Sequence, residues 1–178
     1  MNTISTQSKL SPKVKKLVLL LLCLAFFGGV AQHFIVINTT PSVSKGLYLQ
    51  TWTTPEQGDL VLVDPPDNIV FREARKKRIL SNGLSSAGTC YMIKIVAATA
   101  GDEVEIRKEG MFVNGEKLTN SQRQNWQIEG MVELPIKKKL KDEVLLYTPH
   151  PRSFDSRYFG LLERKTILSS LKPLFLWN

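Results

Sequence analysis

The sequence is poor in the residues that form disulfides and hold metals, with two cysteines and two histidines in 178 residues. Cys23 lies inside an apolar N-terminal segment and Cys90 lies far along the chain, so we expect no intramolecular disulfide. His33 and His150 are also far apart, and no Cys or His spacing matches a metal-ligand motif. The sequence therefore predicts no metal, no other cofactor and a domain that folds without a disulfide.

Acidic residues are absent before Glu56, although the chain as a whole has a net charge of +8. Half of that excess comes from four lysines in the first sixteen residues: Lys9, Lys13, Lys15 and Lys16. The remainder of the chain has an excess of only four basic residues, which is weak evidence for a nucleic-acid partner because such a partner requires a concentrated patch. We therefore expect no nucleic acid among the partners.

The N-terminal region contains one long uncharged run, Leu17–Ala31, and the apolar residues Phe34–Ile37 extend it. Together, residues 17–37 reach the ~20 residues that a bilayer core requires. The basic flank before the run predicts that the N-terminus stays inside. The sequence thus predicts a cytoplasmic tail over residues 1–16, a membrane anchor over 17–37 and an exported domain over 38–178.

The same segment allows a second interpretation as a cleaved signal peptide. Gly29 and Ala31 are small residues at the spacing of a cleavage site, so cleavage after Ala31 would remove the segment. The apolar character that resumes at Phe34 favours a retained anchor. Both interpretations place the rest of the chain outside the cytoplasm.

The exported part predicts a single, mainly β domain. Short apolar or alternating segments bounded by turn residues indicate strands at Leu60–Val63, Tyr91–Val96, Glu103–Ile106, Met111–Val113 and Asp142–Tyr147. Ile69–Leu80 fits a helix with a basic face, and Lys137–Lys141 is expected to be a solvated basic surface.

Three segments of this domain carry groups suited to catalysis. Ser42 follows the N-terminal segment in a stretch with proline and glycine, where a plain turn is the ordinary interpretation. Lys94 lies among apolar residues of a predicted strand; burial would lower its pKa, whereas an edge strand would leave it in water. Asp155 and Arg157 would share one face of an extended strand and could form an ion pair.

In this order behind an N-terminal anchor, these segments resemble the signal peptidase I superfamily over nearly the whole chain. The resemblance rests on Ser42 just after the anchor and on the segments Gly58–Val61, Lys94–Val104, Phe112–Gly115 and Asp155–Gly160. Within the superfamily, Thr-Pro-Ser-Val-x-Lys-Gly-Leu-Tyr is most similar to the conjugative-transfer (TraF-type) branch. Ser44 stands where that branch is expected to have proline, so Ser44 is an alternative nucleophile.

The resemblance implies a role for each group at the site. Ser42 is the expected nucleophile and Lys94 the expected general base of a Ser–Lys dyad, in a domain on the periplasmic side of a bacterial inner membrane. The expected oxyanion donors are the Thr40 hydroxyl and the Ser42 backbone N–H. The supporting residues implied are Ser153, which would orient the lysine, and the pair Asp155 and Arg157; the resemblance leaves open whether Asp155 also contributes to activity.

The expected partners are the membrane and a precursor protein with small residues before the cut, most simply a pilin of a conjugation apparatus. Candidate residues for the pockets that receive these small side chains are Val43, Leu47 and Tyr91. Hydrolysis by water would give a cut chain, and attack by a peptide amine would give a cyclic one. The sequence does not distinguish between these two products.

Other functions stay open alongside this one. A housekeeping leader peptidase and a catalytically silent pilus or secretion assembly factor would share the same domain. A Ser42–His150–Asp155 triad is disfavoured because nothing around Ser42 resembles a nucleophile elbow. A protein that contacts membrane or DNA through Arg72–Arg78 and Lys137–Lys141 would show strongly salt-dependent binding.

Overall fold

The computed structural model describes residues 11–31 and 33–177, which fall into two units divided after Ile35. The first unit contains helix α1 (Pro12–Ala31). Ser11 precedes this helix, and its hydroxyl accepts a hydrogen bond from Val14 N at 3.4 Å. Leucines along the helix are largely exposed, with Leu19 at 63%.

The predicted anchor over residues 17–37 starts inside this helix and extends beyond its C-terminal end. The helix ends at Ala31, Gln32 lies outside the described residues, and Ile35–Asn38 form strand β1. No helix within the described ranges has both the length and the apolar character needed to cross a membrane.

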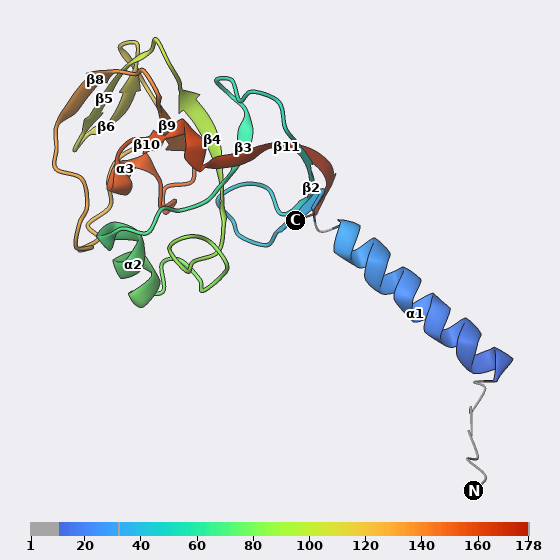
Figure 1. The fold of residues 1–178 in the computed structure, drawn as a ribbon. Helices are drawn as coiled ribbons and strands as arrows, with labels where there is room; N and C mark the ends of the chain where they lie inside the picture. Colours follow the sequence, from blue (N-terminus) through green and yellow to red (C-terminus); the bar gives the residue numbers. More distant parts are fainter. Residues whose placement is uncertain (1–10, 32, 178) are drawn as a thin grey trace, which may run out of the picture. The chain divides into compact units, whose positions relative to one another are not determined.

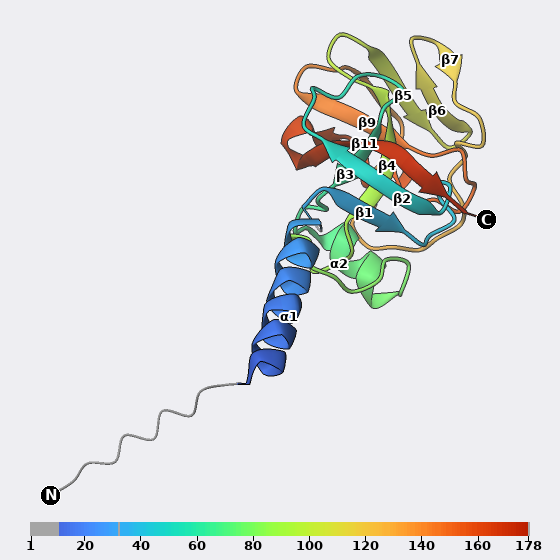
Figure 2. The same cartoon turned by 90° about the vertical axis from the view of Figure 1, so that its right-hand side faces the viewer.

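The second unit is mainly β, as predicted, and contains two antiparallel sheets (Figures 1 and 2). The larger sheet has seven strands in the spatial order β1 (Ile35–Asn38), β2 (Gly46–Thr51), β11 (Ile167–Leu176), β3 (Leu60–Val63), β4 (Met92–Ala98), β9 (Glu143–Tyr147) and β10 (Leu162–Glu163). The last long strand, β11, thus lies between β2 and β3 and joins the start of the domain to its centre.

The smaller sheet has the order β7 (Glu116–Lys117), β6 (Gly110–Val113), β5 (Glu103–Arg107) and β8 (Ile136–Lys139). Strand β8 contains the first three residues of the predicted basic surface, and these three lysines are exposed. Lys137 Nζ lies 2.9 Å from a Glu103 carboxylate oxygen and 2.7 Å from one of Glu105 on the neighbouring strand. The basic run is therefore solvated, as expected, and also forms an edge strand that its charges protect from further pairing.

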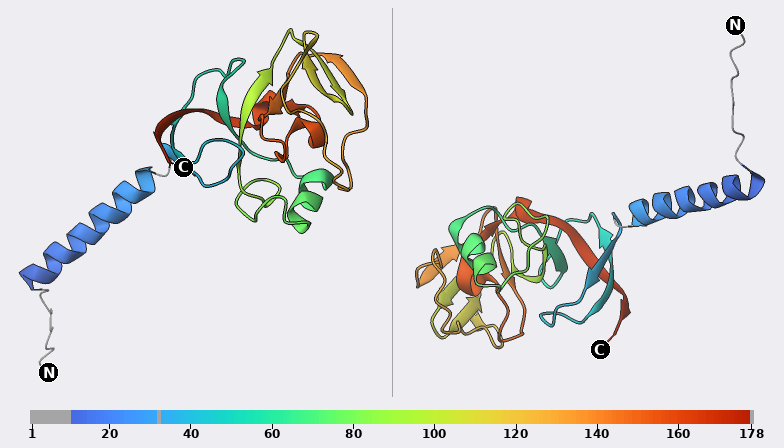
Figure 3. Two further views of the ribbon diagram at one scale, coloured as in Figure 1. Left: turned by 180° about the vertical axis from the view of Figure 1, so that it is seen from behind. Right: turned by 90° about the horizontal axis from the view of Figure 1, so that it is seen from below.

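Two short helices pack against each other beside the larger sheet (Figure 3). Helix α2 (Ile69–Lys76) begins at Asn68, whose side chain accepts a hydrogen bond from Phe71 N at 3.3 Å. The predicted helix was longer, but Arg78 has a φ of 57°, which a right-handed helix does not allow. Helix α3 (Ser156–Phe159) meets α2 through Phe159, whose ring centroid lies 5.0 Å from that of Phe71.

Strand β4 separates the apolar clusters of the domain. Met92 and Val96 pack into the cluster that contains α2 and α3, whereas Ile93 packs on the other face with residues of β2 and β3. The alternation expected of a strand is thus observed, and it assigns Lys94 to the face of Met92 and Val96. Because β4 pairs with β3 and β9, Lys94 lies on an interior strand and the edge-strand interpretation is wrong.

Candidate active site

Ser42 lies in the loop between β1 and β2, and the last residue of β1 fixes that loop. The Asn38 side chain is 4% exposed, and its Nδ2 donates to the carbonyl oxygens of Thr40, Val43 and Ser44 at 3.1, 3.1 and 3.0 Å. The Tyr48 hydroxyl also donates to the Ser44 carbonyl, at 2.5 Å. The loop is therefore exposed but attached to buried groups beneath it.

The Ser42 hydroxyl lies beside the Thr40 hydroxyl, with 3.3 Å between the two oxygens. Thr40 Oγ1 donates to Asn38 Oδ1 at 2.8 Å, because an amide oxygen can only accept. Thr40 has then used its proton, so in this arrangement the hydroxyl of Ser42 donates to Thr40. The two predicted groups lie side by side, and Thr40 must release Asn38 before it can donate to an oxyanion.

Lys94 is buried, at 4% exposed, and its Nζ donates to Ser153 Oγ at 3.0 Å. Burial lowers the pKa of Lys94 from 10.5 to about 8; the Asp155 carboxylate raises it and the Arg157 guanidinium lowers it, both by less than burial does. At pH 7 such an amine is neutral about a tenth of the time, some ~300 times more often than an amine with an ordinary pKa. Lys94 is therefore equipped to accept a proton near neutral pH.

Asp155 and Arg157 form the predicted ion pair, but the predicted extended strand is wrong. Residues Ser156–Phe159 are helix α3, and the Asp155 side chain caps its first turn by accepting from Arg157 N at 3.2 Å. The guanidinium binds both carboxylate oxygens, at 2.7 and 2.6 Å, and both side chains are at most 1% exposed. A helix forms here because Asp favours the N-cap position, and the alternation used to predict a strand does not take that preference into account.

Arg157 also binds the loop that leads from β9 to α3. Its Nη2 donates to the carbonyls of Thr148 and His150 at 3.2 and 3.0 Å, and its Nη1 donates to Pro151 and Asn120 carbonyls at 3.4 and 2.8 Å. The pair therefore holds in place the loop that ends at Ser153, the residue that contacts Lys94. Its arrangement is that of a supporting element for the lysine.

Ser42 lines an open cavity of about 860 Å³. Its walls come from the Ser42 loop, from Ile95 of β4, from the Pro149–Pro151 loop, from Leu176 at the end of β11 and from Trp177, which follows that strand. Lys94 is not in this wall, and among the described residues no hydrogen bond joins Ser42 Oγ to Lys94 Nζ. The Pro149–Ser153 segment connects the two halves of the site, because one end lines the cavity and the other binds Lys94.

The residues expected to shape the substrate pockets are divided by the structure. Val43 lines the cavity, whereas Leu47 and Tyr91 do not. Tyr91 is 42% exposed, and its hydroxyl donates to the Leu84 carbonyl at 3.2 Å. Of these three, only Val43 lines the cavity that contains Ser42.

His150 lines the cavity and is half-buried rather than fully solvated. Its Nδ1 accepts from Arg152 N at 3.3 Å, and in the described part of the chain its ring makes no hydrogen bond to Ser42 or Asp155. The carboxylate of Asp155 is instead bound by Arg157. This geometry does not correspond to a Ser–His–Asp triad.

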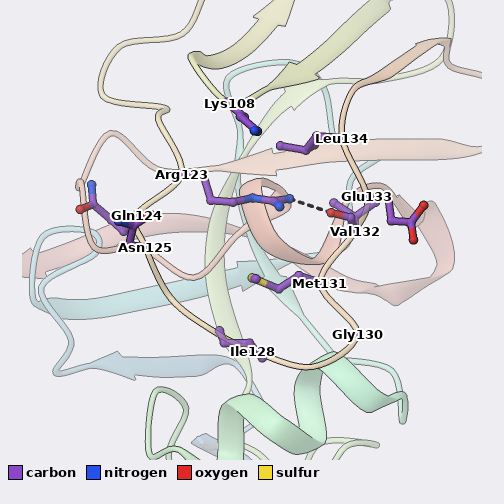
Figure 4. A pocket seen from close by; sticks show the side chains of 10 residues that line it. All are labelled: Lys108, Arg123, Gln124, Asn125, Ile128, Gly130, Met131, Val132, Glu133 and Leu134. Atoms are coloured by element: carbon purple, nitrogen blue, oxygen red, sulfur yellow. Dashed lines mark hydrogen bonds between the residues drawn. The ribbon is translucent and has the colours of Figure 1, made fainter.

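A second cavity, of about 520 Å³, is lined mainly by the segment of residues 123–134, which covers α3 (Figure 4). Arg123 in its wall donates from Nε to the Arg157 carbonyl at 2.7 Å and from Nη2 to the Val132 carbonyl at 3.0 Å. Trp126 of the same segment stacks on Tyr158 of α3, with 4.7 Å between ring centroids. The segment thus braces the helix that carries Arg157.

Sequence reasoning missed three contributors to the site: Asn38, Arg123 and the end of β11. Asn38 directly follows an apolar run, so a polar residue at a buried strand end was the one available signal. Arg123 and β11 reach the site only through the tertiary fold. Among the described residues, no group of three His, Cys, Asp or Glu side chains is placed to hold a metal ion.

Comparison with known proteins identifies a family, two relatives and a solved structure. The signal peptidase, peptidase S26, family matches residues 13–176. Plasmid transfer protein TraF of Escherichia coli is 34% identical over 149 residues, which cover 79% of this chain and 82% of the relative. Conjugal transfer protein TraF of Agrobacterium tumefaciens (strain 15955) is 34% identical over 146 residues, covering 80% and 82%. A crystal structure of a signal peptidase I from Enterococcus faecalis V583 aligns with a TM-score of 0.39 and 16% identity, covering 68% of this chain and 100% of that one.

Proposed function

The chain belongs to the signal peptidase, peptidase S26, family, and from that membership we propose that it is a serine endopeptidase with Ser42 as nucleophile and Lys94 as general base. The observation that carries the proposal is the buried amine of Lys94, with a pKa lowered to about 8 and held by Ser153 on the segment that lines the Ser42 cavity. An amine of this kind accepts a hydroxyl proton near neutral pH, which an ordinary surface lysine does not.

The proposed reaction is an acyl transfer. The Ser42 hydroxyl leaves Thr40 and passes its proton to neutral Lys94 as Oγ attacks the scissile carbonyl. The ammonium then protonates the leaving amine, and an ester to Ser42 remains. Donation by the Ser42 N–H and by a Thr40 hydroxyl turned away from Asn38 stabilises the oxyanion, each donor contributing ~3–4 kcal/mol in comparable sites. Water or a peptide amine finally attacks the ester and regenerates both groups.

The proposed substrate is an exported precursor protein, and pilin maturation in conjugative transfer is the role that similarity to plasmid and conjugal transfer proteins supports. Val43 forms part of the cavity wall next to Ser42 and is the proposed contact for a small side chain before the cut. A general leader peptidase would instead accept many signal-peptide precursors, so a panel of both substrate types separates the two roles.

The proposed place of action is the periplasmic face of a bacterial inner membrane, to which residues 17–37 attach the peptidase domain. Support comes from the sequence, in which a basic flank precedes an uncharged apolar run. Extraction of cell membranes with alkaline carbonate tests the attachment. A tethered protein stays in the pellet, and release of the intact chain into the supernatant contradicts the proposal.

The central experiment uses the full chain in detergent with a candidate pilin precursor and follows the products by mass spectrometry. Ser42→Ala and Lys94→Ala are expected to abolish processing, and Ser44→Ala is the matched control that keeps it. The product mass distinguishes a cut chain from a ring, which is lighter by one water. Wild-type rates in either of the first two variants would refute the dyad, and inactivity of the wild type on every precursor would favour a silent assembly factor.

A further inference from the structure

We infer that Asn38 is a positioning residue that sets the location of Ser42 and the direction of the Thr40 hydroxyl, an inference that rests on the proposed Ser–Lys chemistry. Asn38 ends β1, four residues before the nucleophile, and its side chain is buried under the loop that carries Ser42. In the described part of the chain none of its side-chain hydrogen bonds is to Ser42 itself, so its action on the nucleophile passes through the loop.

The orientation of the Asn38 amide is fixed by its surroundings. Nδ2 faces three carbonyl oxygens, which can only accept, and Oδ1 faces the Thr40 N–H at 3.0 Å, which can only donate. Exchange of the two amide atoms would place oxygen against oxygen and nitrogen against N–H. The side chain therefore has one orientation, and all of its donor and acceptor capacity is in use.

The three carbonyls bound by Nδ2 belong to residues on both sides of Ser42. Thr40 precedes the nucleophile by two residues, and Val43 and Ser44 follow it. One amide nitrogen thus draws the two arms of the loop together, and Ser42 lies at the turn between them. Removal of this nitrogen leaves three carbonyls without that partner and allows the turn to open.

The amide oxygen has a second effect, on the hydroxyl groups. It accepts from both the N–H and the O–H of Thr40, at 3.0 and 2.8 Å. The Thr40 oxygen is then free only to accept, and the Ser42 proton is directed to it. Asn38 therefore holds the resting site in a defined hydrogen-bonding state, from which the attack on a substrate must begin.

The test measures reaction of the full chain in detergent with a small fluorophosphonate, which forms a covalent bond with an activated serine and does not need the peptide-binding cavity. The maximal labelling rate is recorded against pH for the wild type, Asn38→Ala and Asn38→Asp, with Ser42→Ala and Lys94→Ala as references. Ser85→Ala is the matched structural control, because Ser85 is also buried and accepts from Thr89 N at 2.9 Å in a loop outside the cavity.

We expect Asn38→Ala to lower the maximal labelling rate about 10²-fold, the effect of displacing a reacting group by about 1 Å. The pH midpoint near 8 should stay in place, because the pKa of Lys94 is shifted by burial and by the charges of Asp155 and Arg157, which this substitution leaves in place. Asn38→Asp keeps the acceptor but loses the donor to three carbonyls, so its loss should be at least as large. The control Ser85→Ala should label at the wild-type rate even where it lowers the Tm as much as Asn38→Ala does.

The outcomes separate this inference from the proposed function. If the wild type labels at Ser42 with dependence on Lys94 while Asn38→Ala labels within about threefold of it, Asn38 does not position the nucleophile. If Asn38→Asp labels at the wild-type rate while Asn38→Ala does not, the donation from Asn38 Nδ2 to the three carbonyls has no positioning role. Absence of labelling at Ser42 in the wild type would overturn the proposed function, and the inference would fall with it.

Discussion

The buried amine of Lys94 should make the domain less stable at neutral pH than at high pH. In an unfolded chain the pKa of lysine is ~10.4, and in the folded protein burial lowers the pKa of Lys94 to about 8. Between these values the unfolded chain binds the additional proton, so the free energy of unfolding rises with pH. Below about 8 both states are protonated and the full penalty is present; above ~10.4 both are neutral and it is absent.

The size of the effect follows from the pKa difference. At 1.36 kcal/mol per unit, the penalty is about 3 kcal/mol, and the burial of Lys94 leaves little solvent to screen it. Lys94→Met places an uncharged chain of similar length among Met92 and Val96 and removes the titration. In a domain of this size, about 3 kcal/mol corresponds to a difference in Tm of ~6–12 °C.

The assay is urea unfolding of the full chain in detergent at several pH values from 7 to 10, for the wild type and Lys94→Met. The quantity that tests the argument is the wild-type free energy of unfolding minus that of the variant. Three buried tyrosines, Tyr48, Tyr147 and Tyr158, have a raised pKa and reduce stability at the alkaline end. They are present in both proteins, so their contribution cancels in the difference.

The expected difference rises by about 2–3 kcal/mol between pH 7 and pH 10. At pH 10 the wild type should therefore be as stable as the variant or more stable. A difference that stays constant to within about 1 kcal/mol would show that the fold does not disfavour the ammonium. Lys94 would then have no special readiness to accept a proton, and the proposed dyad would lose its physical basis.

Three further predictions concern the groups around this amine and the closure of the sheet. Asp155→Asn removes a charge that raises the pKa of Lys94, so the midpoint of the pH profile of kcat/KM should move below about 8. Arg157→Gln removes a charge that lowers this pKa, so the midpoint should move above about 8. Each variant should also lose about 3–5 kcal/mol of stability in urea unfolding. Ser153→Ala removes the acceptor 3.0 Å from Nζ and should lower kcat/KM about 10²-fold in a peptide-cleavage assay, without abolishing folding. Gly46→Ala would place a methyl group 2.3 Å from a β11 carbonyl oxygen and should cost about 1–3 kcal/mol, measured by thermal unfolding.

Strands with a clear local pattern could be predicted from the sequence. Leu60–Val63 matches β3 in full, and β4 and β9 differ from their predicted ranges by one or two residues at an end. Strand β11 was not predicted, because its ten residues contain a proline, which argues against a strand between two others. The structure accommodates Pro173 at an irregularity in the pairing with β2, which no local pattern reveals.

The candidate site shows the same limit. The burial of Lys94 was one of two interpretations that its apolar neighbours allowed, and the pairing of Asp155 with Arg157 was expected from their charges and from a strand conformation that the structure does not have. The helical conformation at α3 did not follow, because four residues carry too little periodicity to tell a turn of helix from a strand. The role of Asn38 depends on a loop that returns over it, and only the fold brings those carbonyls to its amide.

The position of β11 also determines when the site can come into being during biosynthesis. Strands β2 and β3 are made early, yet each pairs with β11, and Thr51 and Ser170 are partners although 119 residues separate them. A nascent chain grows from its N-terminus, so the Ser42 loop emerges long before the strand that joins it to the sheet containing Lys94. Pairing over such a distance must also overcome the entropy of closing a long loop. A partly synthesised chain therefore lacks the wall formed by Leu176 and Trp177, and the order of synthesis itself delays completion of the candidate site until Trp177 has been added.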